Sequence, residues 1–271
     1  MRKTIVISIA VTLCFVVLII VNAPPEDSAL DAARPIPISK VFEVLEAEND
    51  TVRKLWTEEI VGAGQKRGLE FNKSWRNPEL EAGPLPALFL RETAESLRRS
   101  PLRLYLFLGS DFPINDANQF TGLQNSRFAE IRETGEPQFF YDDDTSFQIA
   151  MFPDVAVAET CVRCHNKEPE TTKSDWKLGD IMGASTWSYP ASSVSLDEAI
   201  SMVQALRIGF RESYDQYIEK VATFANPPKV GKNWPTDGYY LPSTDVFIAK
   251  VGERASPITL QTIIEFQRGM E

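Results

Sequence analysis

The chain has 271 residues, of which 43% are hydrophobic and 24% are charged, and this composition excludes a disordered or collagen-like protein. The 28 Lys and Arg against 38 Asp and Glu give a net charge of −10. No positive surface field is therefore available to a phosphate backbone, and nucleic acid is not expected as a partner. One histidine and three cysteines occur in the whole chain, and the histidine directly follows one of the cysteines.

The first feature in chain order is an apolar N-terminal segment, which predicts a membrane anchor or an uncleaved signal over residues 1–24. The apolar run 5–21 covers ~25 Å as a helix, close to the ~30 Å thickness of a hydrocarbon core. Pro24 and Pro25 follow a poor small-residue cleavage pattern, and this disfavours removal by a peptidase. Because Arg2 and Lys3 are expected to stay inside, we predict a single-pass inner-membrane protein with its remaining chain in the periplasm.

Residues 25–37 have proline at both ends and no apolar periodicity, so they are expected to be a linker. Cys14 lies in the membrane segment, where a small apolar filler is the expected role. A helix over residues 38–71 is predicted by apolar side chains that recur every three, four or seven positions.

The centre of the chain alternates helix and strand signals. Residues 87–99 and 122–134 predict helices, the second closed by Gly135. Strands are predicted at residues 102–108, 138–141, 147–152 and 180–189, with the middle two forming a hairpin around the acidic turn 142–145. The three aspartates of that turn lack the ligand spacing of a calcium loop, so a solvated turn is expected. This order indicates an α+β domain, residues 38–191, with an antiparallel sheet flanked by helices.

A helical C-terminal extension is predicted for residues 192–271. Ser195 and Glu198 form a capping-box pattern, and the helix that follows is expected to run to about Phe224. Residues 226–243 are rich in Pro and Gly and predict a loop. The last helix is expected at residues 257–267, with Ser256 as its cap.

The pattern that carries chemistry is Cys161-Val162-Arg163-Cys164-His165, the spacing of c-type haem attachment. Two thiols three residues apart on one helical turn can form thioethers with the two vinyl groups of a porphyrin. The adjacent imidazole is then held at the iron as its proximal ligand. We therefore expect one covalent haem c at Cys161 and Cys164, with His165 as the iron ligand.

Three other interpretations of this motif stay open. Zinc needs a fourth ligand besides Cys161, Cys164 and His165, which a carboxylate would have to supply. A thioredoxin-like redox pair leaves His165 unexplained and lacks a βαβ context. A structural disulfide between the two cysteines would close a strained, very short loop.

Side chains around the motif suggest further ligands. Aromatic residues of the predicted strands can line a porphyrin or serve as ordinary core: Phe139, Phe140, Tyr141, Phe147, Phe152 and Trp187. Arg103 and Arg127 are candidates to pair with propionates or are solvated surface charges. The candidates for the sixth iron ligand are a methionine (Met151 or Met182), a lysine (Lys167, Lys173 or Lys177) and water, and the position can also be vacant.

Four segments in this order resemble a known family: PLPALFL at 84–90, SDFPIN at 110–115, CVRCH at 161–165 and GDIMGA at 179–184. The family is that of the single-haem, c-type PAS-like sensor domains, formerly catalogued as a domain of unknown function. The resemblance implies a PAS-like antiparallel sheet and a haem held by Cys161, Cys164 and His165. It also implies sensing of redox state or small gases. Some members use a cysteine thiolate as the distal ligand, but the only spare cysteine of this chain is Cys14.

The resulting hypothesis is a membrane-anchored periplasmic haem protein that senses redox state or a diatomic ligand and signals to a redox or signalling protein. The alternative is a periplasmic electron-transfer cytochrome with a methionine as sixth ligand. An enzymatic role such as peroxide turnover needs a distal acid or base, and the only histidine is assigned to the iron.

Overall fold

The computed structural model describes residues 35–268, so the predicted anchor at 1–24, with Cys14, and most of the predicted linker lie outside the described residues. The described residues from Ile36 onward belong to one compact unit, Ile36–Glu271. Within residues 35–268, none of the helices combines the length and apolar character of a membrane span.

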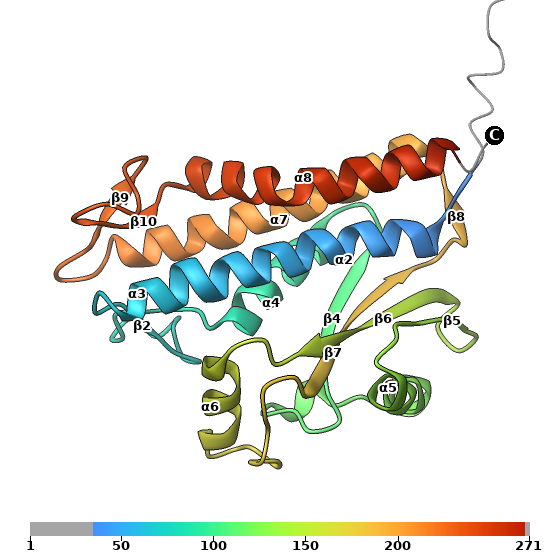
Figure 1. Cartoon of the computed structure of the whole chain (residues 1–271), viewed down its shortest axis with the longest axis horizontal. Helices are drawn as coiled ribbons and strands as arrows, with labels where there is room; N and C mark the ends of the chain where they lie inside the picture. Colours follow the sequence, from blue (N-terminus) through green and yellow to red (C-terminus); the bar gives the residue numbers. More distant parts are fainter. Residues whose placement is uncertain (1–34, 269–271) are drawn as a thin grey trace, which may run out of the picture. The chain divides into compact units, whose positions relative to one another are not determined.

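The first long element is a continuous helix (Figure 1). It consists of α2 (Ile38–Leu55), a π-helical segment η2 (Trp56–Gly62) and α3 (Ala63–Gln65). The helix predicted over 38–71 is confirmed up to Gln65, but its predicted end is wrong because the chain turns after Gln65 and residues 70–71 form a strand. That strand, β2 (Glu70–Phe71), pairs in parallel with β3 (Ala82–Gly83).

The central sheet has four antiparallel strands in the order β4, β7, β6, β5. Its strands are β4 (Tyr105–Gly109), β5 (Gln138–Asp142), β6 (Phe147–Val155) and β7 (Ile181–Tyr189), which confirms all four strand predictions to within a few residues. The turn between β5 and β6 is held by Asp142, whose carboxylate accepts hydrogen bonds from the Asp144 amide and the Thr145 hydroxyl at 3.1 and 2.9 Å.

Helices cover both faces of this sheet. Helices α2, α4 (Pro86–Arg99), α7 (Leu196–Val221) and α8 (Thr244–Arg268) form one layer, while α5 (Gly122–Thr134) and α6 (Glu159–Lys167) lie on the other side of the strands in Figure 1. Helix α5 ends as predicted at Gly135, whose φ of 75° is the left-handed conformation that glycine tolerates best. The α+β expectation is thus confirmed as a mixed structure with small sheets.

The main core joins helices from both sides of residue 192. The Trp56 ring stacks on Phe89 of α4 with centroids 4.1 Å apart, and Tyr214 of α7 stacks on Phe247 of α8 at 4.2 Å. Trp56 also meets Tyr214 edge-on at 6.0 Å. All of these rings are buried. Helices α7 and α8 therefore complete the same core that α2 and α4 begin.

Two predictions at the C-terminal end need correction. Ser195 caps α7 as predicted, accepting from the Glu198 amide at 3.2 Å. The Glu198 carboxylate does not reach back, however, because it accepts from the Tyr189 hydroxyl of β7. The helix predicted at 257–267 is wrong in its start: α8 begins at Thr244 and contains Pro257, and the Ser256 hydroxyl donates to the Gly252 carbonyl within the helix.

Two short strand pairs and a 3-10 turn complete the described residues. Strand β1 (Ile36–Pro37) pairs with β8 (Ser193–Val194), and β9 (Lys229–Gly231) pairs with β10 (Tyr239–Pro242) inside the predicted loop. A single 3-10 turn, η3 (Asp116–Asn118), follows β4. The pairing of β1 with β8 places the start of the described chain beside the start of α7.

Candidate functional site

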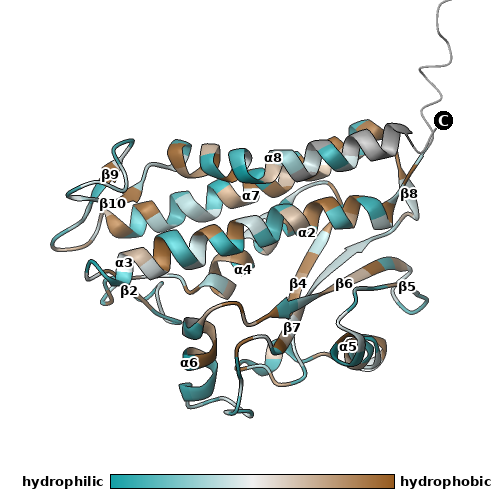
Figure 2. Ribbon diagram, viewed as in Figure 1, coloured by the Kyte–Doolittle hydropathy of each residue, from teal (hydrophilic) through white to brown (hydrophobic). Residues whose placement is uncertain are grey.

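The motif lies on helix α6, between the end of β6 and the segment leading to β7 (Figure 1). Cys161, Cys164 and His165 are at positions i, i+3 and i+4, so the helical repeat places all three on one face. Glu159 in the first turn and Lys167 in the last turn both complement the helix dipole. In Figure 2 the middle of α6 is hydrophobic and its ends are hydrophilic.

The two thiols are free and only partly exposed. Burial, followed by the nearby Glu168 carboxylate and Cys161, raises the pKa of Cys164 above its ordinary value. Burial also lowers the pKa of His165, against the opposing effect of Glu168. The imidazole is therefore neutral at neutral pH, which is the form that can ligate a metal. The thiols and imidazole present the chemistry of the attachment motif, with neither thiol consumed by a disulfide.

Apolar side chains pack against one side of α6. Ala156, Trp176 and Met182 form a small buried cluster, with Cys161 and Val162 packed on it. Met151 belongs to a different cluster, beneath α5 with Phe120 and Phe128. Of the two methionines suggested by the sequence, the structure thus brings Met182 and not Met151 beside the motif.

Trp176 is held by the residue that directly follows the motif histidine. The side-chain amide nitrogen of Asn166 donates to the backbone carbonyl of Trp176 at 2.9 Å. The backbone amide of Trp176 donates in turn to the side-chain oxygen of Asn166 at 2.9 Å. The ring also meets Phe112 edge-on at 6.3 Å. Sequence reasoning missed Trp176 and Phe112 as site residues, although SDFPIN, which contains Phe112, was one of the segments that carried the family resemblance.

The candidate lysines differ in their surroundings. The Lys173 ammonium lies 4.7 Å from the Trp176 ring centroid and pairs with Asp175 at 2.5 Å, whereas Lys167 and Lys177 are exposed. Lys73, which sequence reasoning missed, reaches the end of α6 and pairs with Glu168 at 2.9 Å and Glu170 at 2.6 Å. This contact fixes α6 beside the segment that follows α3.

Neither arginine suggested for the propionates lies at α6. The Arg103 guanidinium is 5.6 Å from the Phe147 ring, at the first residue of β6, whereas α6 follows the last residue of that strand. Eight steps of a strand cover ~26 Å. Arg127 lies over Phe140 at 5.5 Å and pairs with Glu130 on α5. The interpretation of these two as ordinary charges is the one that the structure supports.

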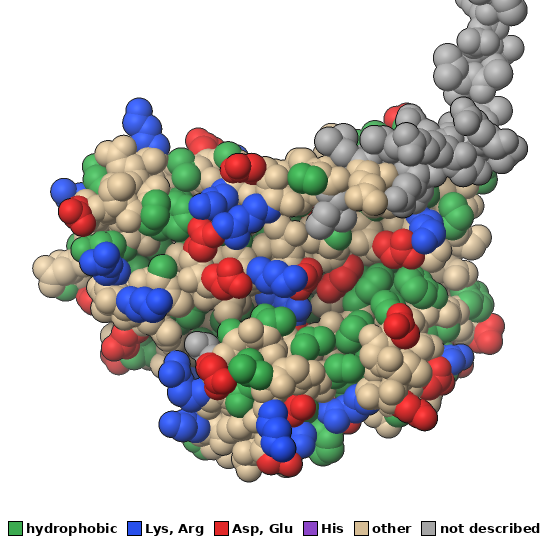
Figure 3. Space-filling model, viewed as in Figure 1, with side chains coloured by type: hydrophobic (Ala, Val, Ile, Leu, Met, Phe, Trp, Pro, Cys, Tyr) green, Lys and Arg blue, Asp and Glu red, His purple; other side chains and the backbone are tan. Residues whose placement is uncertain are grey.

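The aromatic residues suggested as a porphyrin lining are also spread over both faces of the sheet. Phe152, Trp187 and Phe139 lie on the α2 side, where Phe139 meets Phe152 at 5.6 Å. Phe140 and Phe147 pack with the cluster beneath α5. Trp187 donates to Glu46 of α2 at 2.8 Å and is fully buried, so it serves the core. Figure 3 shows hydrophobic side chains gathered below α2. Phe139 and Tyr141 are exposed on β5, an edge strand of the sheet.

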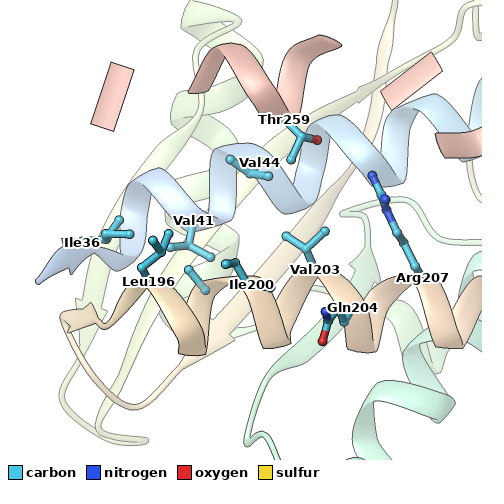
Figure 4. A pocket seen from close by; sticks show the side chains of 10 residues that line it. Ile36, Val41, Val44, Leu196, Ile200, Val203, Gln204, Arg207 and Thr259 are labelled. Carbon is cyan, nitrogen blue, oxygen red and sulfur yellow. The ribbon is translucent and has the colours of Figure 1, made fainter. Parts of the chain in front are cut away.

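A separate cavity of about 220 Å³ lies between α2 and α7 (Figure 4). Its lining is largely aliphatic, with Arg207 and Thr259 on one side. Both of these side chains bind the buried Glu48, Arg207 with two hydrogen bonds and Thr259 with one at 2.7 Å. The cavity shares no residue with α6. Over residues 35–268, no three His, Cys, Asp or Glu side chains are grouped as a metal site.

A family model described as Tll0287-like matches residues 37–190. The chain belongs to the Tll0287-like family. No curated protein and no solved structure matches the chain.

The Tll0287-like region contains the four-stranded sheet, α6 and all three motif residues, and it ends just before α7. The Tll0287-like family is cytochrome c-like, which makes this region a candidate haem-binding domain.

Proposed function

We propose that this chain is a membrane-anchored periplasmic c-type haem protein that senses redox state or a small ligand at a His-ligated iron. The observation that carries the proposal is the α6 face, on which two free thiols and a neutral imidazole lie beside an apolar cluster. Membership of the Tll0287-like family supports a haem-binding role. The apolar N-terminal sequence supports the anchor and the export of the remaining chain.

The residues fit a covalent haem c. Cys161 and Cys164 would supply the thioether sulfurs, and His165 would hold the iron through a ring nitrogen. The buried indole Nε1 of Trp176 has no hydrogen-bond partner, which is consistent with an acceptor that belongs to a bound group. When bound, the haem supplies an iron whose oxidation state and ligation can change. The chain's own part is to hold the iron from one side and to exclude water with Met182, Ala156 and Trp176.

The proposal includes a PAS-like character for the domain, supported by an antiparallel sheet with helices on both faces. A redox or signalling protein is the proposed partner. With no cysteine other than Cys161 and Cys164 in the described residues, the sixth position is proposed to be weakly ligated or open, so that a diatomic ligand can reach it.

The direct test is haem retention. The full-length chain, produced with haem and then denatured, is expected to keep haem on the polypeptide. The double variant Cys161→Ser, Cys164→Ser loses it, and Cys14→Ser, as a matched cysteine control, keeps it. Measurement is by haem-dependent staining after denaturing electrophoresis. Colourless wild-type protein would end the haem proposal.

An electron carrier is the second candidate, favoured by Met182, which packs in the same cluster as Cys161. A thioether at the sixth position would raise the reduction potential. Ligation by Met182 predicts a long-wavelength sulfur-to-iron charge-transfer band in the oxidised protein. The band should be lost in Met182→Ala and kept in Met151→Ala.

For the sensor, carbon monoxide should shift the Soret band of the reduced protein. An unchanged Soret band would reject the gas-sensing form.

A further inference from the structure

Two buried nitrogen donors near α6 lack an acceptor. The indole Nε1 of Trp176 and the Nε of Arg132 are both inaccessible to solvent and have no hydrogen-bond partner among the described residues. Trp176 as a whole is only 3% exposed. Leaving a buried donor unpaired is energetically costly, and native proteins rarely tolerate it without a reason.

The two donors belong to one group of side chains, the Trp176 cluster, formed by Trp176, Arg132, Lys173 and Phe112. The Arg132 guanidinium carbon lies 5.4 Å from the Trp176 ring centroid and 5.3 Å from that of Phe112. The Lys173 ammonium lies over the same indole at 4.7 Å. A cation on an aromatic face is attractive in itself, so these contacts hold the donors together.

Acidic side chains of the chain do not satisfy these donors. Asp111 accepts from a terminal nitrogen of Arg132 at 2.8 Å, and Asp175 pairs with Lys173. Neither carboxylate takes the Arg132 Nε or the Trp176 Nε1. The cluster therefore retains two N–H groups for an acceptor that is not part of the described chain.

The Trp176 cluster is tied to the motif in two ways. Asn166, the residue after His165, holds the Trp176 backbone with two hydrogen bonds. The Trp176 ring packs in the cluster that includes Met182 and Cys161. A haem bonded to the Cys161 sulfur would thus extend from the side of α6 against which the Trp176 cluster packs.

We propose that Trp176 Nε1–H and Arg132 Nε–H donate to a propionate carboxylate of the haem held by Cys161, Cys164 and His165, with Lys173 adding positive charge. The inference rests on the proposed function. Its chemistry matches the donors: a carboxylate has two oxygens and is ionised at neutral pH, and hydrogen bonds to an ionised acceptor are about twice as strong as neutral ones.

Trp176 is stronger evidence for this site than Arg132. Arg127 also has an unpaired buried Nε, yet it lies over Phe140 and away from α6. An unpaired arginine nitrogen alone would therefore identify no site. The inference depends on Trp176, which is buried, fixed by Asn166 and in contact with the motif.

The test uses the full-length haem-loaded chain and the variants Trp176→Phe and Arg132→Lys. Trp234→Phe is the matched control, because Lys250 lies over Trp234 at 4.8 Å as Lys173 does over Trp176. The readouts are the propionate bending frequency in the resonance Raman spectrum and the pKa that links the midpoint potential to pH. Removing a donor should shift the frequency and raise the proton affinity of the carboxylate about tenfold, while the control stays unchanged.

Wild-type values of both readouts in Trp176→Phe and Arg132→Lys, with haem still covalent, would overturn the inference and leave the proposed function intact. Absence of covalent haem in the wild type rejects the proposed function instead. Circular dichroism checks the fold of each variant. If Trp176→Phe does not fold, Arg132→Lys decides, since it keeps a cation over the rings but loses the Nε donor.

Discussion

At the scale of single residues, Glu46 is a carboxylic acid whose pKa is raised well above its ordinary value. It lies on α2 and accepts from the Trp187 indole at 2.8 Å and, weakly, from Asn49 at 3.4 Å. Burial raises its pKa from 4.5 to about 7, and the Trp187 hydrogen bond and Arg53 only partly oppose this. The folded protein thus holds a proton at Glu46 that the unfolded chain releases.

This difference predicts that the free energy of unfolding falls as pH rises. Above about 4.5 the unfolded carboxyl is ionised, whereas the folded one stays protonated until about 7. The loss is at most about 3 kcal/mol between those values. Urea unfolding at several pH values should show it, with Glu46→Gln flattening the slope. Glu43→Gln, an exposed control on the same helix, should keep the slope.

A pH-independent stability in the wild type, or the same slope in Glu46→Gln, would contradict the raised pKa of Glu46.

The motif residues and Glu46 also differ in how far the sequence predicts their surroundings. Cys161, Cys164 and His165 are adjacent in sequence, so local spacing predicts their shared face. Glu46, Trp176 and Lys73 contact side chains from segments distant in the chain, and no local sequence pattern predicts those contacts.

At the scale of elements, prediction succeeded where local signals act alone. Helix α5 ends at Gly135, and the β5–β6 hairpin turns at its aspartates. It failed for α8, where Pro257 was taken as a first helical residue. The buried Phe247, Val251 and Ala255 recur every four residues before that proline, so the helical period was present. The capping box predicted for Glu198 does not form, because its carboxylate accepts a hydrogen bond from the Tyr189 hydroxyl of β7 instead.

The contact between β4 and β7 permits a test of close packing. A Cβ on Gly183 would lie 2.4 Å from the Gly109 carbonyl oxygen, whereas one on Gly252 in α8 meets nothing within 4 Å. Gly183→Ala should therefore lower the free energy of unfolding by about 1–3 kcal/mol. Gly252→Ala should raise it by roughly 0.5–1 kcal/mol, because glycine is unfavourable within a helix.

Chemical denaturation of the two variants under one condition measures both effects. Equal or reversed changes would show that β4 and β7 do not approach as closely as described. The Ser110 hydroxyl, which donates to the Met182 carbonyl at 2.6 Å, holds the same two strands at this point.

At the scale of the whole molecule, the Tll0287-like match stops near Pro190 but the hydrophobic core does not. Helix α7 buries six large side chains in that core: Met202, Leu206, Phe210, Tyr214, Tyr217 and Val221. Their burial is worth about 10 kcal/mol together, similar to the roughly 5–15 kcal/mol net stability of a typical domain.

A chain that ends after Pro190 is therefore expected to lose cooperative unfolding and near-ultraviolet circular dichroism. A chain that ends after Arg268 is the control and should behave as the wild type. Limited proteolysis provides a second measurement, since the shortened chain should be cut within α2 and α4. A resistant, cooperatively folded fragment would show that the matched region is independent.

The long helix from Ile38 to Gln65 also separates the two ends of this unit. It spans roughly 40 Å, and α6 lies on the other side of the strands, where Lys73 pairs with Glu168 (Figure 1). Ile36 and Thr259 of α8 line one cavity at the near end. Immobilising the protein on an electrode near either described chain end would therefore leave α6 facing the solution. For the haem proposed on α6, electron exchange with the electrode would then need a mobile mediator, while a dissolved protein could meet α6 directly.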